Sequence, residues 1–160
     1  MSEHRLLIVG SGEVASALIA IADTLGWSTT ATESLDRVLT ALPDTESVIV
    51  LSHDPAIDGP ALAAAVASRP TYVGAMGSRR TQTRRRDWML ANGTSPAQLA
   101  AIHGPAGLDI GAMKPAEIAL SVAAEIVAST RRVDASGSLS RRDGPIHPDL
   151  AAGLADCPAG

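Results

Sequence analysis

The regular alternation of short apolar runs with longer helix-forming segments is the feature that most limits how this chain can fold. The apolar runs are rich in β-branched and aliphatic residues and predict strands. They cover residues 5–9, 28–32, 47–51 and 71–73. Apolar residues at helical spacing predict helices over residues 13–25, 35–42, 60–68, 81–92, 95–102 and 115–130. This order predicts an α/β fold: a Rossmann-like, doubly wound parallel sheet with helices on both faces.

The end of this alternation sets the expected domain boundary. A length of 160 residues fits one domain with its own core. Beyond Arg132 the pattern is lost, and Gly, Ser, Pro and Asp dominate. We therefore assign residues 1–132 to a Rossmann-like cofactor-binding domain and residues 133–160 to a tail.

Composition limits the partners and the compartment. The formal net charge is -4, and the only aromatic residues are two Trp and one Tyr, which argues against a nucleic-acid partner. No apolar run is long enough for a signal peptide or a membrane span. The single cysteine, Cys157, cannot form an internal disulfide. We therefore expect a cytoplasmic protein without a membrane span.

A glycine-rich loop joins the first predicted strand to the first predicted helix. It reads Gly10-Ser11-Gly12-Glu13-Val14-Ala15, and it matches the G-x-G-x-x-G/A pattern in the required context. Backbone N–H groups at such a helix start suit a phosphate or pyrophosphate, although Glu13 adds a negative charge there. Glu33 lies 21 residues after Gly12, where a carboxylate binds ribose hydroxyls and favours NAD over NADP. The alternative is a turn that binds nothing.

A second loop of similar character precedes the helix predicted over residues 81–92. It contains Gly77, Ser78, Arg79 and Arg80. Ser78 is expected to cap the helix, and the two arginines are expected to bind the oxygen atoms of an anion. The alternative is a capped turn beside a solvated basic face, because three more arginines follow at 84–86 and point in different directions on a helix.

Two other loops carry imidazole and carboxylate groups. His53 and Asp54 follow the third predicted strand, and His103 and Asp109 stand in a segment rich in Gly and Pro. Ligands bind at the carboxyl edge of such a sheet, where these four side chains could meet near one pocket. General acid–base chemistry, metal binding and the simple fixing of loop turns all remain open. No pair has a metal-ligand spacing and no serine-nucleophile motif occurs, so we assign no metal ligand and no catalytic residue.

Four stretches of the sequence resemble one known family. They are GSGEVASAL near the start, VIVLSHDPAID from Val48, YVGAMGSRRT from Tyr72 and HGPAGLDIGAMKPAEIALSVAAE from His103. Over roughly residues 5–132, the chain is similar to the carboxyl-terminal Rossmann domain of the XdhC/CoxI family, the xanthine dehydrogenase accessory proteins. The resemblance implies a chaperone that binds the molybdenum cofactor (molybdopterin), supports exchange of an oxo ligand for sulfur, and delivers the cofactor to a molybdenum hydroxylase apoenzyme of the xanthine or CO dehydrogenase type.

The chain also departs from the family's pattern. It begins at the Rossmann strand, without the family's separate amino-terminal domain and its Cys-Gly element. Glu13 stands where the family usually has histidine, Ala106 replaces a larger aliphatic residue, and residues 113–114 replace an acidic and small polar pair. Residues 144–147 (GPIH) resemble the family's usual chain end. A second chain that supplies the missing domain, a homodimer, and a loss of cofactor handling all remain open.

Three functions of the chain therefore remain open. The first is a molybdenum cofactor chaperone without a chemical step of its own. The second is an NAD(P)-binding oxidoreductase, although few residues remain after the Rossmann core to form a substrate domain. The third is a nucleotide-sensing module without catalysis. In each case the expected cofactor-binding residues are Gly10, Ser11, Gly12, Glu13, Val14, Glu33, His53, Asp54, Gly77, Ser78, Arg79, Arg80, His103 and Asp109.

Overall fold

A computed structural model describes residues 3–135 and 137–141 of the chain. The described residues form a five-stranded sheet in the order β2-β1-β3-β4-β5, and every neighbouring pair is parallel. The strands are β1 (Arg5–Val9), β2 (Ser28–Thr32), β3 (Ser47–Val50), β4 (Tyr72–Ala75) and β5 (Ile102–His103). The predicted parallel α/β sheet is confirmed.

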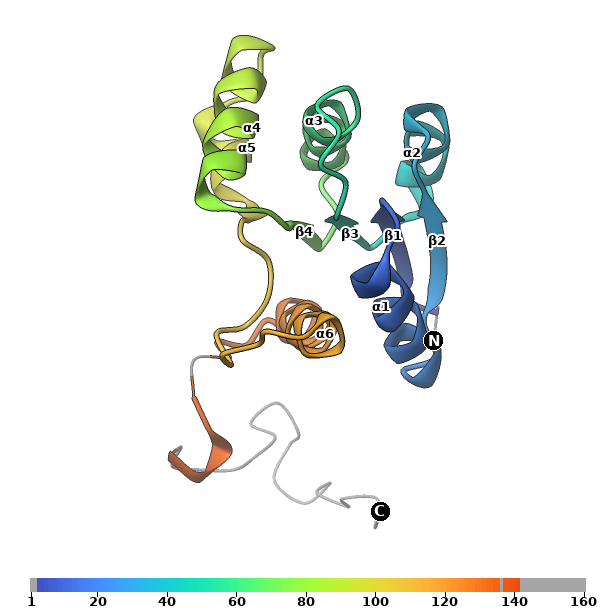
Figure 1. Cartoon of the computed structure of the whole chain (residues 1–160), viewed down its shortest axis with the longest axis vertical. Helices are drawn as coiled ribbons and strands as arrows, with labels where there is room; N and C mark the ends of the chain where they lie inside the picture. The colour runs from blue at the N-terminus through green and yellow to red at the C-terminus, as the bar shows by residue number, and fades with distance from the viewer. Residues whose placement is uncertain (1–2, 136, 142–160) are drawn as a thin grey trace.

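Helices cover both faces of the sheet, as predicted (Figure 1). One face carries α1 (Glu13–Thr24) and α6 (Pro115–Arg131), and the two helices pack against each other. The other face carries α2 (Leu35–Ala41), α3 (Asp58–Ser68), α4 (Arg79–Ala91) and α5 (Pro96–Ala100). Short 3-10 turns lie at Leu42–Asp44 and Leu139–Arg141.

Side-chain alternation along the strands divides the core into two. Leu6 and Ile8 of β1 pack with α1 and α6, whereas Leu7 and Val9 pack with the helices of the other face. All four side chains are buried, because both faces of a parallel sheet must be covered by helices. The near-continuous apolar character of residues 6–9 therefore reflects a doubly covered strand.

The main correction to the predicted elements concerns β5. Residues 95–102 were predicted as one helix, but α5 ends at Ala100, and Ile102 and His103 join the edge of the sheet beside β4. A strand of two residues has no periodicity for sequence analysis to detect. The other predicted elements differ from the structure by a few residues at their ends.

The strand order fixes where a ligand site is expected. From β1 the chain crosses to β2 on one side and then returns to β3 on the other side of β1. The reversal between β1 and β3 is the topological switch point, and ligands of open α/β sheets bind outside the carboxyl ends of the strands there. The glycine-rich loop and residues 51–54 follow these two strands directly.

Some expectations fall outside the described residues. Cys157 and the GPIH segment at 144–147 lie there, and the assignment of residues 133–160 to a tail stays a prediction. In the described ranges, no helix combines the length and apolar character needed to cross a membrane.

Candidate functional site

The glycine-rich loop has the backbone geometry that close approach of a ligand requires. At Gly10, a Cβ atom would lie 2.8 Å from the backbone nitrogen of Ser52, so only glycine lets the end of β1 pass this close to the end of β3. Gly12 caps α1 with φ 105°, a conformation that disfavours other residues, and the space beside it is open. The loop therefore leaves room for a ligand at the start of α1.

The start of α1 leaves backbone donors available. Gly12 has no side chain to cap the helix, and the N–H groups of Glu13, Val14 and Ala15 donate to no described residue. Free N–H groups and the helix dipole at this end favour a phosphate. Glu13 is exposed. These observations fit the predicted phosphate position.

Next to this loop, the end of β2 borders a hollow of about 490 Å³. The Glu33 carboxylate accepts a hydrogen bond of 3.0 Å from the Ser11 hydroxyl, so the predicted ribose-binding carboxylate and the glycine loop are in contact. Arg37 of α2 also lines the hollow, although sequence analysis did not single it out. A carboxylate suits a free ribose and an arginine suits a 2′-phosphate, so the hollow favours neither NAD nor NADP.

A buried arginine holds the neighbouring strand ends in place. Arg85 of α4 is 1% exposed, and it donates hydrogen bonds of 2.8 Å to the Ser52 carbonyl and 2.5 Å to the Met76 carbonyl. Its Nε also donates to the fully buried Asp58 carboxylate at 2.8 Å. Burial acts to raise the pKa of Asp58, but hydrogen bonds from Arg84 and Arg85 outweigh it and lower that pKa.

Arg85 is a residue whose role sequence analysis missed. The run of five arginines in residues 79–86 gave no signal that one of them is buried. Arg85 and Met89 are four residues apart and both are buried on the inner side of α4. This helical spacing is the pattern that points to a buried Arg85.

The second predicted anion loop forms a capped helix start. The Ser78 hydroxyl accepts a hydrogen bond of 3.2 Å from the Thr81 N–H, which confirms the predicted cap of α4. Gly77 precedes it with φ 139°. Arg79 and Arg80 are exposed, and their guanidinium groups bind no described residue. They are free to meet a ligand, and equally free to remain solvated.

The turn after β3 supports a structural role for Asp54, in which its side chain fixes the turn. Its carboxylate accepts a 2.9 Å hydrogen bond from the Ala56 N–H, and its carbonyl accepts from Ile57 and Asp58 at the start of α3. Such a local hydrogen bond is how Asp fixes a turn. His53 is exposed beside it.

A separate cavity of about 600 Å³ lies beside α6 and the edge strand β5. His103 and Asp109 line it, together with Leu108 and Glu125, and His53 and Asp54 do not. The four His and Asp side chains therefore do not line this cavity together. The chain leaves β5 at His103 and passes beside α6, where the Leu108 N–H donates to the Ser121 carbonyl.

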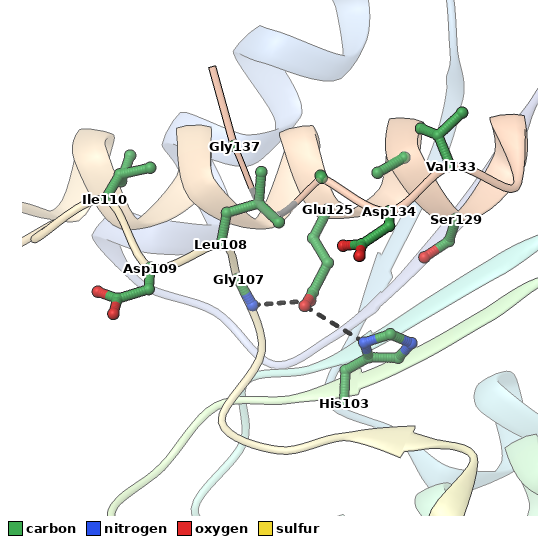
Figure 2. A pocket seen from close by; sticks show the side chains of 12 residues that line it. His103, Gly107, Leu108, Asp109, Ile110, Glu125, Ser129, Val133, Asp134 and Gly137 are labelled. Atoms are coloured by element: carbon green, nitrogen blue, oxygen red, sulfur yellow. Dashed lines mark hydrogen bonds and ion pairs between the residues drawn. The ribbon is translucent and has the colours of Figure 1, made fainter. Parts of the chain in front are cut away.

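Glu125 organises this cavity, and sequence analysis did not assign it a role. Its carboxylate accepts hydrogen bonds from the Tyr72 hydroxyl at 2.7 Å and from the Gly107 N–H at 2.8 Å. It also lies 3.2 Å from Nδ1 of His103 (Figure 2). The His103 and Tyr72 rings stack, with centroids 4.7 Å apart.

The electrostatics of this cluster follow from these contacts. The hydrogen bond to Glu125 raises the pKa of His103, against the opposing effect of burial. Burial acts to raise the pKa of Glu125, but hydrogen bonds from His103, Tyr72 and Gly107 lower it below its ordinary value. Burial, followed by the neighbouring carboxylate, raises the pKa of Tyr72 well above its ordinary value. The cluster therefore favours the charged forms of His103 and Glu125 and the neutral form of Tyr72.

Among the residues that the structure describes, no group of three or more His, Cys, Asp or Glu side chains is arranged to hold a metal ion. The predicted site residues instead form two regions. The carboxyl-edge site comprises Gly10–Val14, Glu33 and Gly77–Arg80, with His53 and Asp54 on the turn after β3. The His103 cavity comprises His103, Asp109 and Glu125.

Comparison with known proteins adds evidence on the family. The XdhC Rossmann domain matches residues 6–126. A molybdenum cofactor insertion chaperone, PaoD of Escherichia coli (strain K12), is 36% identical over 128 residues, which cover 79% of this chain and 40% of PaoD. The chain thus spans well under half the length of this relative.

A solved structure described as a xanthine dehydrogenase from Bacillus halodurans has the same fold. It aligns with a TM-score of 0.64 at 23% identity, over 86% of this chain and 45% of that chain. At this identity the likeness concerns the fold alone. The family match covers most of the chain, and the chain belongs to the XdhC Rossmann domain family.

Proposed function

We propose that this chain is an accessory protein that binds a molybdenum cofactor as cargo and takes part in its insertion into a molybdenum hydroxylase. The 36% identity to the insertion chaperone PaoD, over 79% of this chain, is the observation that carries the proposal. That relative is much longer, so this chain corresponds to one part of it. The cytoplasm remains the expected compartment, on the composition argued above.

The carboxyl-edge site supplies the physical support for cargo binding. Molybdopterin carries a phosphate, and its dinucleotide form carries a pyrophosphate and a ribose. The free N–H groups at residues 13–15 suit either phosphate, and the open space beside Gly12 leaves room for it. Arg79 and Arg80 are exposed and suit further phosphate oxygens. In the dinucleotide form, Glu33 would hold the ribose hydroxyls.

In this account the protein's own residues bind and orient the cargo. The molybdenum centre supplies the hydroxylase chemistry only after delivery. The apoenzyme, and any second chain that supplies further family domains, are the proposed macromolecular partners.

A nicotinamide dinucleotide is the second candidate ligand. The hollow of about 490 Å³ between Ser11, Glu33 and Arg37 favours it, because a ribose with or without a 2′-phosphate suits those groups. An oxidoreductase would transfer hydride from the bound dinucleotide to a substrate, whereas a sensor would bind it without turnover.

The test uses Gly12→Val with Gly93→Val as its matched control. Both glycines have positive φ (105° and 93°) and open space around them, so valine strains the backbone at both positions. Only at position 12 does the new side chain occupy the proposed phosphate position. We expect Gly12→Val to lose activation of a molybdenum hydroxylase apoenzyme in a transfer assay with molybdopterin, and Gly93→Val to retain it. Equal activity of the two variants would contradict this placement of the cargo.

A further inference from the structure

The outer side of α6 presents an apolar seam at heptad spacing. The seam comprises Met113, which precedes the helix, and Glu117, Leu120, Ala124, Val127 and Arg131. The five positions from Glu117 to Arg131 follow one another at intervals of three and four residues, which places them along one side of α6. Val122 and Ile126, on the opposite side of α6, are buried in one cluster with residues of β1, β3 and β4.

The large apolar side chains of this seam are exposed in the single chain. Met113 is 86% exposed, Leu120 53% and Val127 38%. Single exposed leucines, such as Leu25 or Leu39, are ordinary on a protein surface. Leu120, Ala124 and Val127 share one heptad register within α6, and a row of this kind is typical of helix–helix contact.

The charges at the two ends of the seam select one arrangement of a partner helix. Glu117 lies in the first turn of α6 and Arg131 lies in its last turn. Two copies of α6 packed antiparallel bring each Glu117 beside the partner's Arg131, and they also oppose the helix dipoles favourably. A parallel pair would instead set Glu117 beside Glu117 and Arg131 beside Arg131. The seam is therefore complementary to itself in the antiparallel orientation only.

Residue size supports the same arrangement. Ala124 lies between Leu120 and Val127 in the middle of the seam. A small residue at the crossing point lets two helices approach closely, with the larger side chains of each packing to either side. A two-fold axis near Ala124 uses the same patch of both copies, as an isologous dimer requires.

Both charged groups remain able to pair. Among the residues that the structure describes, Glu117 is bound only through Oε2, which accepts hydrogen bonds of 2.9 Å from the Met113 and Lys114 N–H groups. Arg131 is exposed and forms no ion pair with a described residue. We infer that two copies of this chain associate as an antiparallel dimer through the α6 seam, with Glu117 of each copy paired to Arg131 of the other.

The test is the mass of the full chain in solution, by analytical ultracentrifugation. At roughly 100 μM chain, a specific dimer should predominate. The expected mass is twice the 16.3 kDa of one chain. Leu120→Asp should weaken association at least about 100-fold, because it buries an unpaired carboxylate at the contact. Leu39→Asp, at a similarly exposed leucine of α2, should leave the dimer unchanged. A monomeric wild-type chain, or equal effects of the two variants, would overturn the inference.

A charge swap between Glu117 and Arg131 distinguishes the antiparallel pairing from nonspecific association. Glu117→Arg and Arg131→Glu should each weaken the dimer about tenfold, since two ion pairs become two repulsions. The double variant should recover wild-type association. Glu117→Arg also removes a helix cap, but Arg131→Glu does not, and circular dichroism checks that each variant is folded. Failure of the double variant to recover association would overturn the proposed orientation.

Discussion

Arg85 joins three parts of the carboxyl edge through one side chain. It binds carbonyl oxygens that follow β3 and β4, and the Asp58 carboxylate at the start of α3. A buried charge that loses its partner retains the penalty of desolvation, so this pair matters most when it is broken. The guanidinium therefore positions the loops around the proposed cargo without itself being exposed to a ligand.

We predict that Arg85→Met destabilises the protein by about 3–5 kcal/mol, because it leaves the buried Asp58 carboxylate without this partner. Chemical denaturation measures the free energy of unfolding. Arg86→Met is the control, since Arg86 is the exposed neighbour and its replacement should change stability by no more than about 0.5 kcal/mol. Similar losses for both variants would contradict the role assigned to Arg85.

The His103–Glu125 pair gives stability a defined dependence on pH. The folded-state pKa of His103 is raised above 6.5, so its stabilising effect is complete below pH 6.5 and is lost as the pH rises through that raised pKa. The folded-state pKa of Glu125 is lowered below 4.5, so its effect is present above pH 4.5 and is lost as the pH falls through that lowered pKa. The pair therefore stabilises the folded state most between pH 4.5 and pH 6.5.

We predict that the stability difference between wild type and His103→Gln is largest near pH 6 and shrinks toward alkaline pH. Urea denaturation at a series of pH values measures it. His53→Gln is the control, because His53 is exposed on the turn after β3. A difference that does not change with pH would show that the ring contributes only its packing against Tyr72.

The start of α4 is the element whose interpretation depends most on a ligand. Ser78 caps the helix, so the turn is complete without any anion. The exposed guanidinium groups of Arg79 and Arg80 are the part that a capped turn does not need. Their contribution can be measured without disturbing the cap.

We predict that Arg79→Ala combined with Arg80→Ala weakens binding of molybdopterin, with each lost charge-assisted contact worth roughly 1.5–3 kcal/mol. Fluorescence titration of the pterin measures the affinity, and thermal unfolding should be unchanged. Arg86→Ala combined with Arg141→Ala removes the same charge outside this turn and should not change the affinity. If the two double variants bind alike, the turn takes no part in holding the cargo.

The elements differ in how far sequence alone predicts them. β1 was predictable from its apolar run followed by a glycine-loop motif, α1 from its amphipathic period, and β2 from its β-branched residues. β5 was not predictable, because two residues have no period and their pairing with β4 depends on the whole sheet. Glu125 was missed for a related reason. It reads as one polar residue of a long helix, and its partners Tyr72 and His103 are brought to it only by the fold.

At the scale of the whole molecule, the fold separates two groups of polar residues that sequence analysis had combined. The glycine loop, Glu33 and the start of α4 follow the carboxyl ends of β1, β2 and β4, where a phosphate-bearing ligand is expected. His103 and Asp109 line a cavity beside α6 instead. Sequence analysis had no information on where the chain turns after β5, so it could not distinguish the cavity lined by His103 and Asp109 from the region of the glycine loop.

The identity of the bound small molecule decides whether the cargo is a molybdenum cofactor. Native mass spectrometry of the protein, purified gently from its own host, reports any bound small molecule, which is then released and identified. We predict a molybdopterin species, present in wild type and Gly93→Val and lost from Gly12→Val. A nicotinamide dinucleotide without any pterin, lost from the same variant, would contradict the claim and assign the carboxyl-edge site to an oxidoreductase or a sensor.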